Sequence, residues 1–251
     1  HAVASAIVAR LRAAGVGDDA LWARAGAYAS HGDEAASTTG AEMARTPFFC
    51  SGCPHNSSTK LPAGSMAASG IGCHGMAAFS DPNTITSSQM GAEGATWIGI
   101  SRFTDMPHMF QNLGDGTYSH SGLLAIRAAV NAKVNLTYKI LFNDAVAMTG
   151  GQTVEGDLTV DTIARQVAAE GIRHIALVSD EPEKYHRGYK FPPTVNVHHR
   201  RELDLIQRQM RETPGVTVII YDQTCAAEKR RRRKRGTFAN PAKRAFINEQ
   251  V

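Results

Sequence analysis

The amino-acid sequence predicts an α/β fold built on a doubly wound, mostly parallel sheet. Two observations lead to this prediction. Helical and strand-like segments alternate along the chain from about residue 46 onward, and the strand-like segments are near-continuous apolar runs. In such a sheet, ligands bind beyond the carboxyl ends of the strands, so we expect the functional residues directly after each strand.

The expected elements are justified by local patterns. Strands are predicted at 65–72, 108–113, 134–142, 172–179 and 216–221, and helices at 119–131, 159–170 and 202–212. The segment 134–142, VNLTYKILF, is the strongest strand signal because β-branched and aromatic residues dominate it. Helix 159–170 carries an apolar stripe and is followed by Gly171, a residue typical of helix ends. Trp97 and Phe110 are expected in the core.

Composition and length indicate a folded chain with one large domain. The 251 residues are 43% hydrophobic and 20% charged, and no apolar run approaches the roughly 20 residues that span a bilayer. With no signal-peptide pattern at the start, we expect a cytoplasmic protein without a membrane partner. Residues 1–45 are interpreted as the end of a preceding domain and a linker, 46–228 as the main domain, and 229–251 as a basic arm leading to a following domain.

The positive charge of the chain is local. The net charge of +4 arises from 27 basic and 23 acidic residues, and seven of the basic residues form the unbroken run Lys229–Arg235. Without that run, 20 basic residues face 23 acidic ones, so we expect no nucleic-acid partner. The run is interpreted as a solvated or interdomain arm.

Two polar motifs follow neighbouring predicted strands. Gly114-Asp115-Gly116 ends one strand, and Asn143 ends the next, 28 residues after Asp115. A right-handed crossover places both strand ends at one edge of the sheet, where the two side chains can offer oxygens to a small divalent cation such as Mg²⁺. The glycines allow a phosphate to approach the backbone. Taken alone, the tripeptide is more often a tight turn, and Asp144 is interpreted as structural.

The four cysteines form a second candidate site. Cys50 and Cys53 make a Cys-x-x-Cys pair, Cys73 follows a glycine-rich segment, and Cys225 lies just beyond the last strand. Because the chain shows no export signal, metal or cluster binding is favoured over disulfides. The spacing leaves a zinc knuckle, a redox dithiol and an iron–sulfur site open.

Five segments, taken together, resemble the 2-oxoacid:ferredoxin oxidoreductases, most closely the long indolepyruvate-type enzymes. They occur in the family's order over about residues 45–250: TPFFCSGCPHN, GIGC, GDGTYSHSG, ILFNDAVAMTGGQ and YDQTC. The resemblance implies a thiamine diphosphate-binding fold. It also implies these sites: Mg²⁺ on Asp115, Asn143 and the Ala145 carbonyl; the diphosphate beside Gly114, Gly116, Thr149 and Gly150; and one [4Fe–4S] cluster on Cys50, Cys53, Cys73 and Cys225.

The resemblance further implies an oxidative decarboxylase of 2-oxoacids, of indolepyruvate or other arylpyruvates, that forms acyl-CoA with coenzyme A and ferredoxin as partners. The catalytic Glu of that family lies on a pyrimidine-binding domain, so no catalytic residue is assigned here. We expect that domain in the same or a partner chain, a dimeric assembly, and a chain that is part of a longer polypeptide. The segment 89–94, which contains Glu93, is expected to line the substrate or thiazolium side, and the basic run could dock acidic ferredoxin.

Two other functions remain open from the residues. A non-oxidative thiamine decarboxylase would not need four placed cysteines, and a zinc-stabilised binding module with a basic nucleic-acid arm would leave the glycine-rich motifs unexplained.

Several histidines and one tyrosine are each open to a purely structural interpretation. His55 and His74 either donate to sulfur or substrate or are polar loop residues, Tyr118 and His120 contact solvent or a domain, and His198-His199 starts a helix on the surface.

Overall fold

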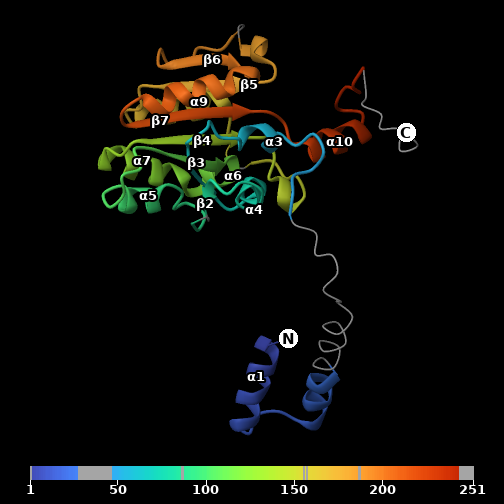
Figure 1. Ribbon diagram of the computed structural model, residues 1–251. Helices are drawn as coiled ribbons and strands as arrows, with labels where there is room; N and C mark the ends of the chain where they lie inside the picture. Colours follow the sequence, from blue (N-terminus) through green and yellow to red (C-terminus); the bar gives the residue numbers. More distant parts are fainter. Residues whose placement is uncertain are drawn as a thin grey trace, which may run out of the picture. The chain divides into compact units, whose positions relative to one another are not determined.

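The structure is a computed structural model that describes residues 2–27, 47–85, 88–154, 156, 158–185 and 188–242 (Figure 1). The chain divides into two compact units, His1–Thr46 and Pro47–Val251. The first unit contains helix α1 (Ala2–Ala13). The second contains the sheet and every site described below.

The second unit is organised around one parallel sheet. Its seven strands run in the order β2-β1-β3-β4-β7-β5-β6, and every neighbouring pair is parallel. The strands are β1 (Ala67–Ala68), β2 (Thr84–Ile85), β3 (Met109–Gly114), β4 (Leu136–Phe142), β5 (Ile175–Ser179), β6 (Val195–His199) and β7 (Val216–Asp222). The predicted α/β, doubly wound fold is confirmed.

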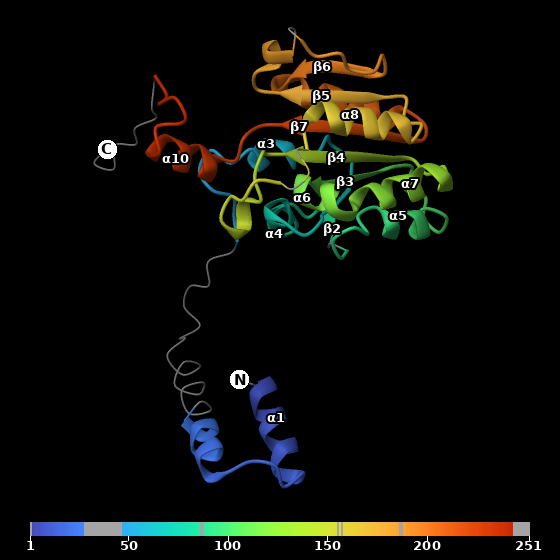
Figure 2. The same ribbon diagram turned by 180° about the vertical axis from the view of Figure 1, so that it is seen from behind.

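Helices cover both faces of the sheet (Figures 1 and 2). Ile140 of β4 and Leu177 of β5 pack in one core cluster with residues of α7 and α8, and the next residues along, Leu141 and Val178, pack in a second cluster with α9. This alternation explains why the strand sequences are apolar throughout. The helices of this unit are α3 (His55–Ser58), α4 (Ala77–Ser80), α5 (Ala95–Ile100), α6 (Asp115–Thr117), α7 (Leu123–Ala132), α8 (Val160–Ala169), α9 (Leu203–Glu212) and α10 (Ala226–Lys234).

The register of the central strands brings their carboxyl ends to one edge. Gly114 at the end of β3 pairs with Leu141, and Phe142 at the end of β4 pairs with Asp222 at the end of β7. The residues that follow these three strands therefore emerge side by side. The site is built on this edge.

Several expectations need correction. The predicted strand 65–72 is only the two-residue β1, and β2 and β6 were not predicted. His198 and His199 end strand β6, and His199 also caps the short helix Arg200–Glu202 that leads into α9, so the predicted helix start at this pair is confirmed. Tyr118 is 2% exposed and donates a hydrogen bond to Gln166, so it does not contact solvent, whereas His120 is exposed. Trp97 and Phe110 are buried, as predicted.

The basic run is also different from the expected solvated arm. Most of it forms helix α10, which directly follows Cys225. Lys229 forms an ion pair with Asp180, and Arg232 forms one with Asp144. The helix is therefore attached to the carboxyl edge of the sheet by its own charged side chains. In the described part of the chain, none of the helices is both long enough and apolar enough to span a bilayer.

Candidate functional site

A cavity of about 310 Å³ opens at the carboxyl edge of the sheet. Most of the residues predicted for the diphosphate and metal sites line it, together with one of the cysteines. They are Gly114, Asp115, Gly116, Asn143, Ala145, Thr149 and Cys73, and the wall also includes His55, His74, Ile71, Met90 and Met148. Gly150 is the one predicted diphosphate residue that is not part of this wall.

Asp115 and Asn143 are linked through the backbone. The Asn143 N–H donates to Asp115 Oδ2 at 2.9 Å, and the Gly116 N–H donates to Asp115 Oδ1 at 2.8 Å. Burial raises the pKa of Asp115 to about 6, although these backbone donors act in the opposite direction. Asn143 Oδ1 is buried without a hydrogen-bond partner among the described residues. A buried carboxylate and an unpartnered amide oxygen on one cavity wall suit a hard cation such as Mg²⁺.

The glycines of the site leave room for a ligand. A Cβ added at Gly116 would meet only Val146, at an ordinary 3.9 Å, so the fold itself does not require glycine there. The loop after β4 is closed by the Val146 N–H, which donates to the Gln152 carbonyl at 2.8 Å. Within it, Gly150 and Gly151 have φ of +124° and +83°, which favour glycine. These residues fit an extended anionic group such as a diphosphate.

The four cysteines come from three distant segments to one neighbourhood. Burial raises the pKa of Cys53 to about 11, and the nearby thiols of Cys73, Cys225 and Cys50 raise it too. Burial likewise raises the pKa of Cys73, with further increases from Cys225 and Cys50. The Cys225 N–H donates to the Asn143 carbonyl at 3.2 Å, which joins the cysteine neighbourhood to the predicted metal ligand.

The Cys-x-x-Cys pair is held by a turn. The Cys53 N–H donates to the Cys50 carbonyl at 2.9 Å, and the Asn56 amide donates to both cysteine carbonyls at 3.2 Å. In the described ranges, no three or more His, Cys, Asp or Glu side chains converge as ligands of a single metal ion. Cluster ligation differs, because each of four thiolates binds a different iron of the cluster.

His55 and His74 are buried wall residues, not polar loop residues. They are 4% and 2% exposed, and their rings meet edge to face with centroids 6.0 Å apart. Burial lowers the pKa of His55 to about 4 and that of His74 to about 3, so both are neutral at pH 7. His74 Nε2 has no partner among the described residues, and the ring lies 3.4 Å from where a Cβ of Gly114 would be.

Glu93 itself is buried away from the cavity that contains Asp115. It is fully buried, and its Oε2 accepts a hydrogen bond from the Gly91 N–H at 2.7 Å. Its side chain lies against Gly70, where an added Cβ would be 2.9 Å from Glu93 Cγ. It is not part of the wall of the cavity that contains Asp115. Met90, from the same segment 89–94, does line that cavity, so the expectation that this segment lines the substrate or thiazolium side stays a prediction that Met90, and not Glu93, supports.

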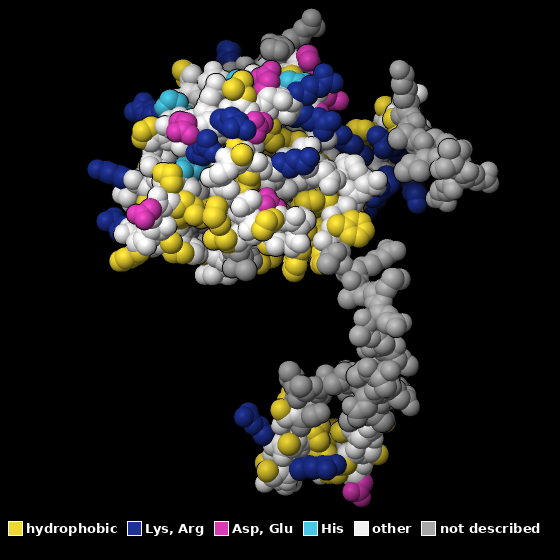
Figure 3. All heavy atoms as spheres, in the orientation of Figure 1, with side chains coloured by type: hydrophobic (Ala, Val, Ile, Leu, Met, Phe, Trp, Pro, Cys, Tyr) yellow, Lys and Arg dark blue, Asp and Glu magenta, His cyan; other side chains and the backbone are white. Residues whose placement is uncertain are grey.

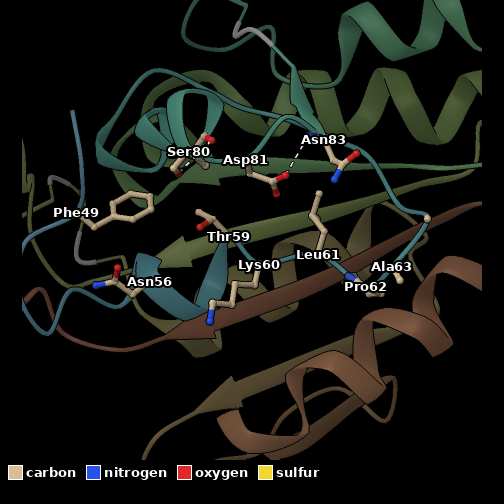
Figure 4. A pocket seen from close by; sticks show the side chains of 12 residues that line it. Phe49, Asn56, Thr59, Lys60, Leu61, Pro62, Ala63, Ser80, Asp81 and Asn83 are labelled. Atoms are coloured by element: carbon tan, nitrogen blue, oxygen red, sulfur yellow. Dashed lines mark hydrogen bonds between the residues drawn. The ribbon is translucent and has the colours of Figure 1, made fainter. Parts of the chain in front are cut away.

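A second hollow of about 440 Å³ lies between residues 59–64 and the segment 77–83 (Figure 4). Three of its polar side chains are engaged within the chain: Asn56 binds the cysteine carbonyls, Thr59 donates to the His55 carbonyl at 2.6 Å, and Asp81 accepts from the Asn83 N–H at 2.9 Å. None of the predicted site residues lines it. The cavity at the strand ends is the stronger candidate.

Sequence reasoning missed the contact between α10 and the loop after β4, which carries Asn143 and Ala145 of this cavity. Arg232 binds Asp144, the residue between Asn143 and Ala145, and Gly151 lies against Glu228 and Arg231. A charged run next to a strand-end cysteine carries no local signal of such a contact, because the partners are 88 residues apart in the chain.

Comparison with known proteins agrees with this geometry. The family model described as thiamine pyrophosphate enzyme, C-terminal TPP binding domain, matches residues 70–221. The indolepyruvate oxidoreductase subunit IorA of Methanothermobacter marburgensis is 29% identical over 196 residues, which cover 72% of this chain and 30% of that protein. The corresponding subunit of Thermococcus kodakarensis is 26% identical over 205 residues, covering 74% of this chain and 30% of that protein.

Among solved structures, a 2-oxoglutarate:ferredoxin oxidoreductase from Magnetococcus marinus, with 2-oxoglutarate, coenzyme A and succinyl-CoA bound, shares the fold. The TM-score is 0.55 at 17% identity, and the match covers 79% of this chain and 67% of that chain. The expected resemblance to the 2-oxoacid:ferredoxin oxidoreductases is confirmed. The chain spans about 30% of the length of the curated relatives that it matches.

Proposed function

Because the chain belongs to the thiamine pyrophosphate enzymes, through their C-terminal TPP-binding domain, we propose that its strand-end cavity binds the diphosphate of this cofactor. In this proposal Mg²⁺ is held by the Asp115 carboxylate, the Asn143 amide oxygen and the Ala145 carbonyl. The diphosphate lies beside Gly114, Gly116, Thr149 and Gly150. The unpartnered Asn143 oxygen and the buried Asp115 carboxylate support the metal assignment.

A [4Fe–4S] cluster on Cys50, Cys53, Cys73 and Cys225 is the second part of the proposal. The observation that supports it is that all four cysteines of the chain lie close enough for Cys50, Cys73 and Cys225 to raise the pKa of Cys53, and that the Cys225 N–H binds the Asn143 carbonyl. Burial and the neighbouring thiols disfavour the thiolate form that ligation needs, and the positive charge of a metal centre would offset that effect. The two sites share a wall, since Cys73 and Asp115 line the same cavity.

Together these groups suit oxidative decarboxylation of a 2-oxoacid. When bound, thiamine diphosphate supplies the electron sink for loss of carbon dioxide, and a cluster supplies one-electron acceptance. The chain's own residues hold the segments that would bind these groups in position. Asp115 holds the Asn143 backbone, and the neutral rings of His55 and His74 fill the wall between the cysteine segment and Gly114.

For the whole protein we propose a ferredoxin-reducing oxidoreductase that converts indolepyruvate or another arylpyruvate to an acyl-CoA. The names of the relatives support the substrate class, and the coenzyme A in the solved neighbour supports the acceptor. In this proposal residues 1–45 end a preceding domain, 46–228 bind the cofactors and 229–251 lead onward. A pyrimidine-binding domain, in this polypeptide or a dimer partner, completes the site and supplies the catalytic Glu.

Anaerobic purification of the intact protein tests the cluster assignment. We expect iron and acid-labile sulfide in equal amounts, about four of each per chain, with a visible absorbance that dithionite bleaches. Cys53→Ser should lose most of that iron, because one ligand of the cluster is removed. Stoichiometric zinc without sulfide or colour would overturn the proposal in favour of a zinc-stabilised module.

A further inference from the structure

Asp144 has an unusual backbone conformation for its position. It lies between Asn143 and Ala145, the two proposed Mg²⁺ ligands after β4, and its φ is +61°. Left-handed backbone is strained for a residue with a Cβ, although Asp and Asn tolerate it better than most. This turn decides whether the Asn143 side chain and the Ala145 carbonyl are presented to the same ion. A contact that stabilises this backbone conformation of Asp144 is therefore required.

Arg232 of helix α10 makes the holding contact. Its Nη1 donates to Asp144 Oδ2 at 2.8 Å, and its Nη2 donates to the Asp144 backbone carbonyl at 3.2 Å. One planar guanidinium thus restrains both the side chain and the peptide unit that leads to Ala145. A lysine could not reproduce this two-point contact, because its ammonium is a single point charge.

Arg232 is itself restrained. Glu228, one turn earlier and 4% exposed, accepts from Arg232 Nε at 3.4 Å and from Arg231 at 3.1 Å. The first residue before α10, Cys225, donates its N–H to the Asn143 carbonyl at 3.2 Å. The turn after β4 is therefore bound at both ends of helix α10. Cys225, just before the helix, contacts Asn143, and Arg232, near its C-terminal end, contacts Asp144.

We propose that Arg232 is a positioning residue for the metal site: through Asp144 it fixes the turn that presents Asn143 and Ala145 to the Mg²⁺ of bound thiamine diphosphate. The inference rests on the proposed cofactor site and deepens it, because it makes α10 a support of that site. Residues that support metal ligands from behind typically change metal affinity by about 10–100-fold when they are removed.

The test is cofactor binding to the intact protein, freed of thiamine diphosphate and Mg²⁺. Thiamine diphosphate is titrated at several Mg²⁺ concentrations by calorimetry, and the Mg²⁺ needed for half-maximal binding is measured. We expect Arg232→Gln to raise that Mg²⁺ requirement by about 10-fold or more. The matched control is Arg230→Gln, on the same helix: Arg230 is exposed, and its side chain forms no hydrogen bond or ion pair with the described residues, so no change is expected.

Two Asp144 variants separate positioning from a general loss of structure. Asp144→Asn tolerates the left-handed backbone and keeps an oxygen for Arg232, so it should bind like wild type. Asp144→Ala should resemble Arg232→Gln, and the double variant should lose no more than either single one. If Arg232→Gln does not fold, Arg232→Lys is measured instead, and we expect it also to raise the Mg²⁺ requirement, by less than Arg232→Gln would.

The outcomes are distinguishable. If Arg232→Gln, or Arg232→Lys in its place, needs the same Mg²⁺ as Arg230→Gln, the positioning role is wrong. The cofactor site is tested separately by Asn143→Ala, which removes a proposed ligand. Normal Mg²⁺-dependent binding by Asn143→Ala would overturn the proposed site itself, and with it this inference.

Discussion

Lys139 lies in the middle of strand β4 and is 1% exposed. Its Nζ donates to the Ser58 carbonyl at 2.7 Å and to Gln207 Oε1 at 3.0 Å, and lies 5.5 Å from the centre of the Phe110 ring. Burial lowers the pKa of Lys139 from 10.5 to about 7, partly opposed by Asp81. The contact with Ser58 ties the end of helix α3, next to the Cys-x-x-Cys pair, to the centre of the sheet.

This burial predicts a pH dependence of stability. Between pH 7 and about 10.5 the unfolded chain keeps the Lys139 proton while the folded chain has lost it, so the free energy of unfolding rises with pH. The contribution is at most about 1.4 kcal/mol per pH unit. Denaturant unfolding of the cofactor-free protein from pH 7 to 10 should show this rise. Lys139→Met should lack it, because methionine does not titrate.

Lys60→Met is the matched control, since Lys60 is exposed. It should follow the wild-type curve at every pH. Parallel curves for wild type and Lys139→Met would show that Lys139 stays protonated in the folded protein, contrary to the expected shift.

At the scale of single residues, the site residues that could be predicted are those that directly follow a strand. Asp115 and Asn143 were predictable because each follows a strong apolar strand, and the register of β3 and β4 brings them together. The burial of His55 and His74 was not predictable, because the neighbouring residues are polar and glycine-rich and the burial comes from packing against distant segments. The contact of Arg232 with Asp144 has the same long-range origin.

At the scale of elements, long apolar segments were predictable and short or polar ones were not. Strands β3, β4, β5 and β7 and helices α7, α8 and α9 lie within a few residues of their predicted positions. Strand β2 has two residues, and β6, with the sequence VNVHH, is only half-buried at the edge of the sheet. Neither has the apolar run on which strand prediction depends. Helix α10 was missed because a run of like charges is more typical of disordered segments.

The packing of α10 against the loop after β4 can be tested with a pair of glycines. Gly151 and Gly156 have nearly the same φ, +83° and +82°. A Cβ at Gly151 would lie 2.3 Å from Glu228 Oε2 and 2.5 Å from Arg231 Nη1, whereas at Gly156 it would meet nothing within 4 Å. Gly151→Ala should therefore lower Tm more than Gly156→Ala and weaken thiamine diphosphate binding.

Gly156→Ala serves as the control because it carries the backbone strain alone, about 1–2 kcal/mol. The difference between the two variants measures the contact with α10. Equal losses of Tm and unchanged binding in both would mean that the loop and α10 do not depend on each other.

At the scale of the whole molecule, the fold gathers segments that are far apart in the sequence. The cysteine pair, the glycine-rich turn before Cys73, the ends of β3 and β4 and the start of α10 meet at one edge of one sheet. The order of the motifs was enough to expect this for the segments that follow strands, since parallel strands share a carboxyl edge. Cys50 and Cys53 precede the first strand, so that argument does not place them. The atomic contacts that hold the site together could not be predicted, because they are made between side chains brought together only by packing.

The larger unit also has an exposed apolar area. Hydrophobic side chains gather on the part of the larger unit around α4, β2 and α5 (Figure 3). Phe79, Ile100 and Phe103 are 69%, 45% and 90% exposed. An apolar area of this kind is typical of a surface that another domain or subunit covers. It agrees with the proposed pyrimidine-binding domain and with the share of the relatives' length that this chain spans.

In the proposed function, thiamine diphosphate and a [4Fe–4S] cluster lie together, and the cluster accepts electrons from the thiamine-bound substrate. The most direct test is an anaerobic single turnover of the intact, oxidised protein with Mg²⁺, thiamine diphosphate and indolepyruvate, followed by electron paramagnetic resonance. We predict release of carbon dioxide together with the signal of a reduced [4Fe–4S] cluster, and neither in Asn143→Ala. Carbon dioxide released with an aldehyde product and no reduced cluster would contradict the account and identify a non-oxidative decarboxylase.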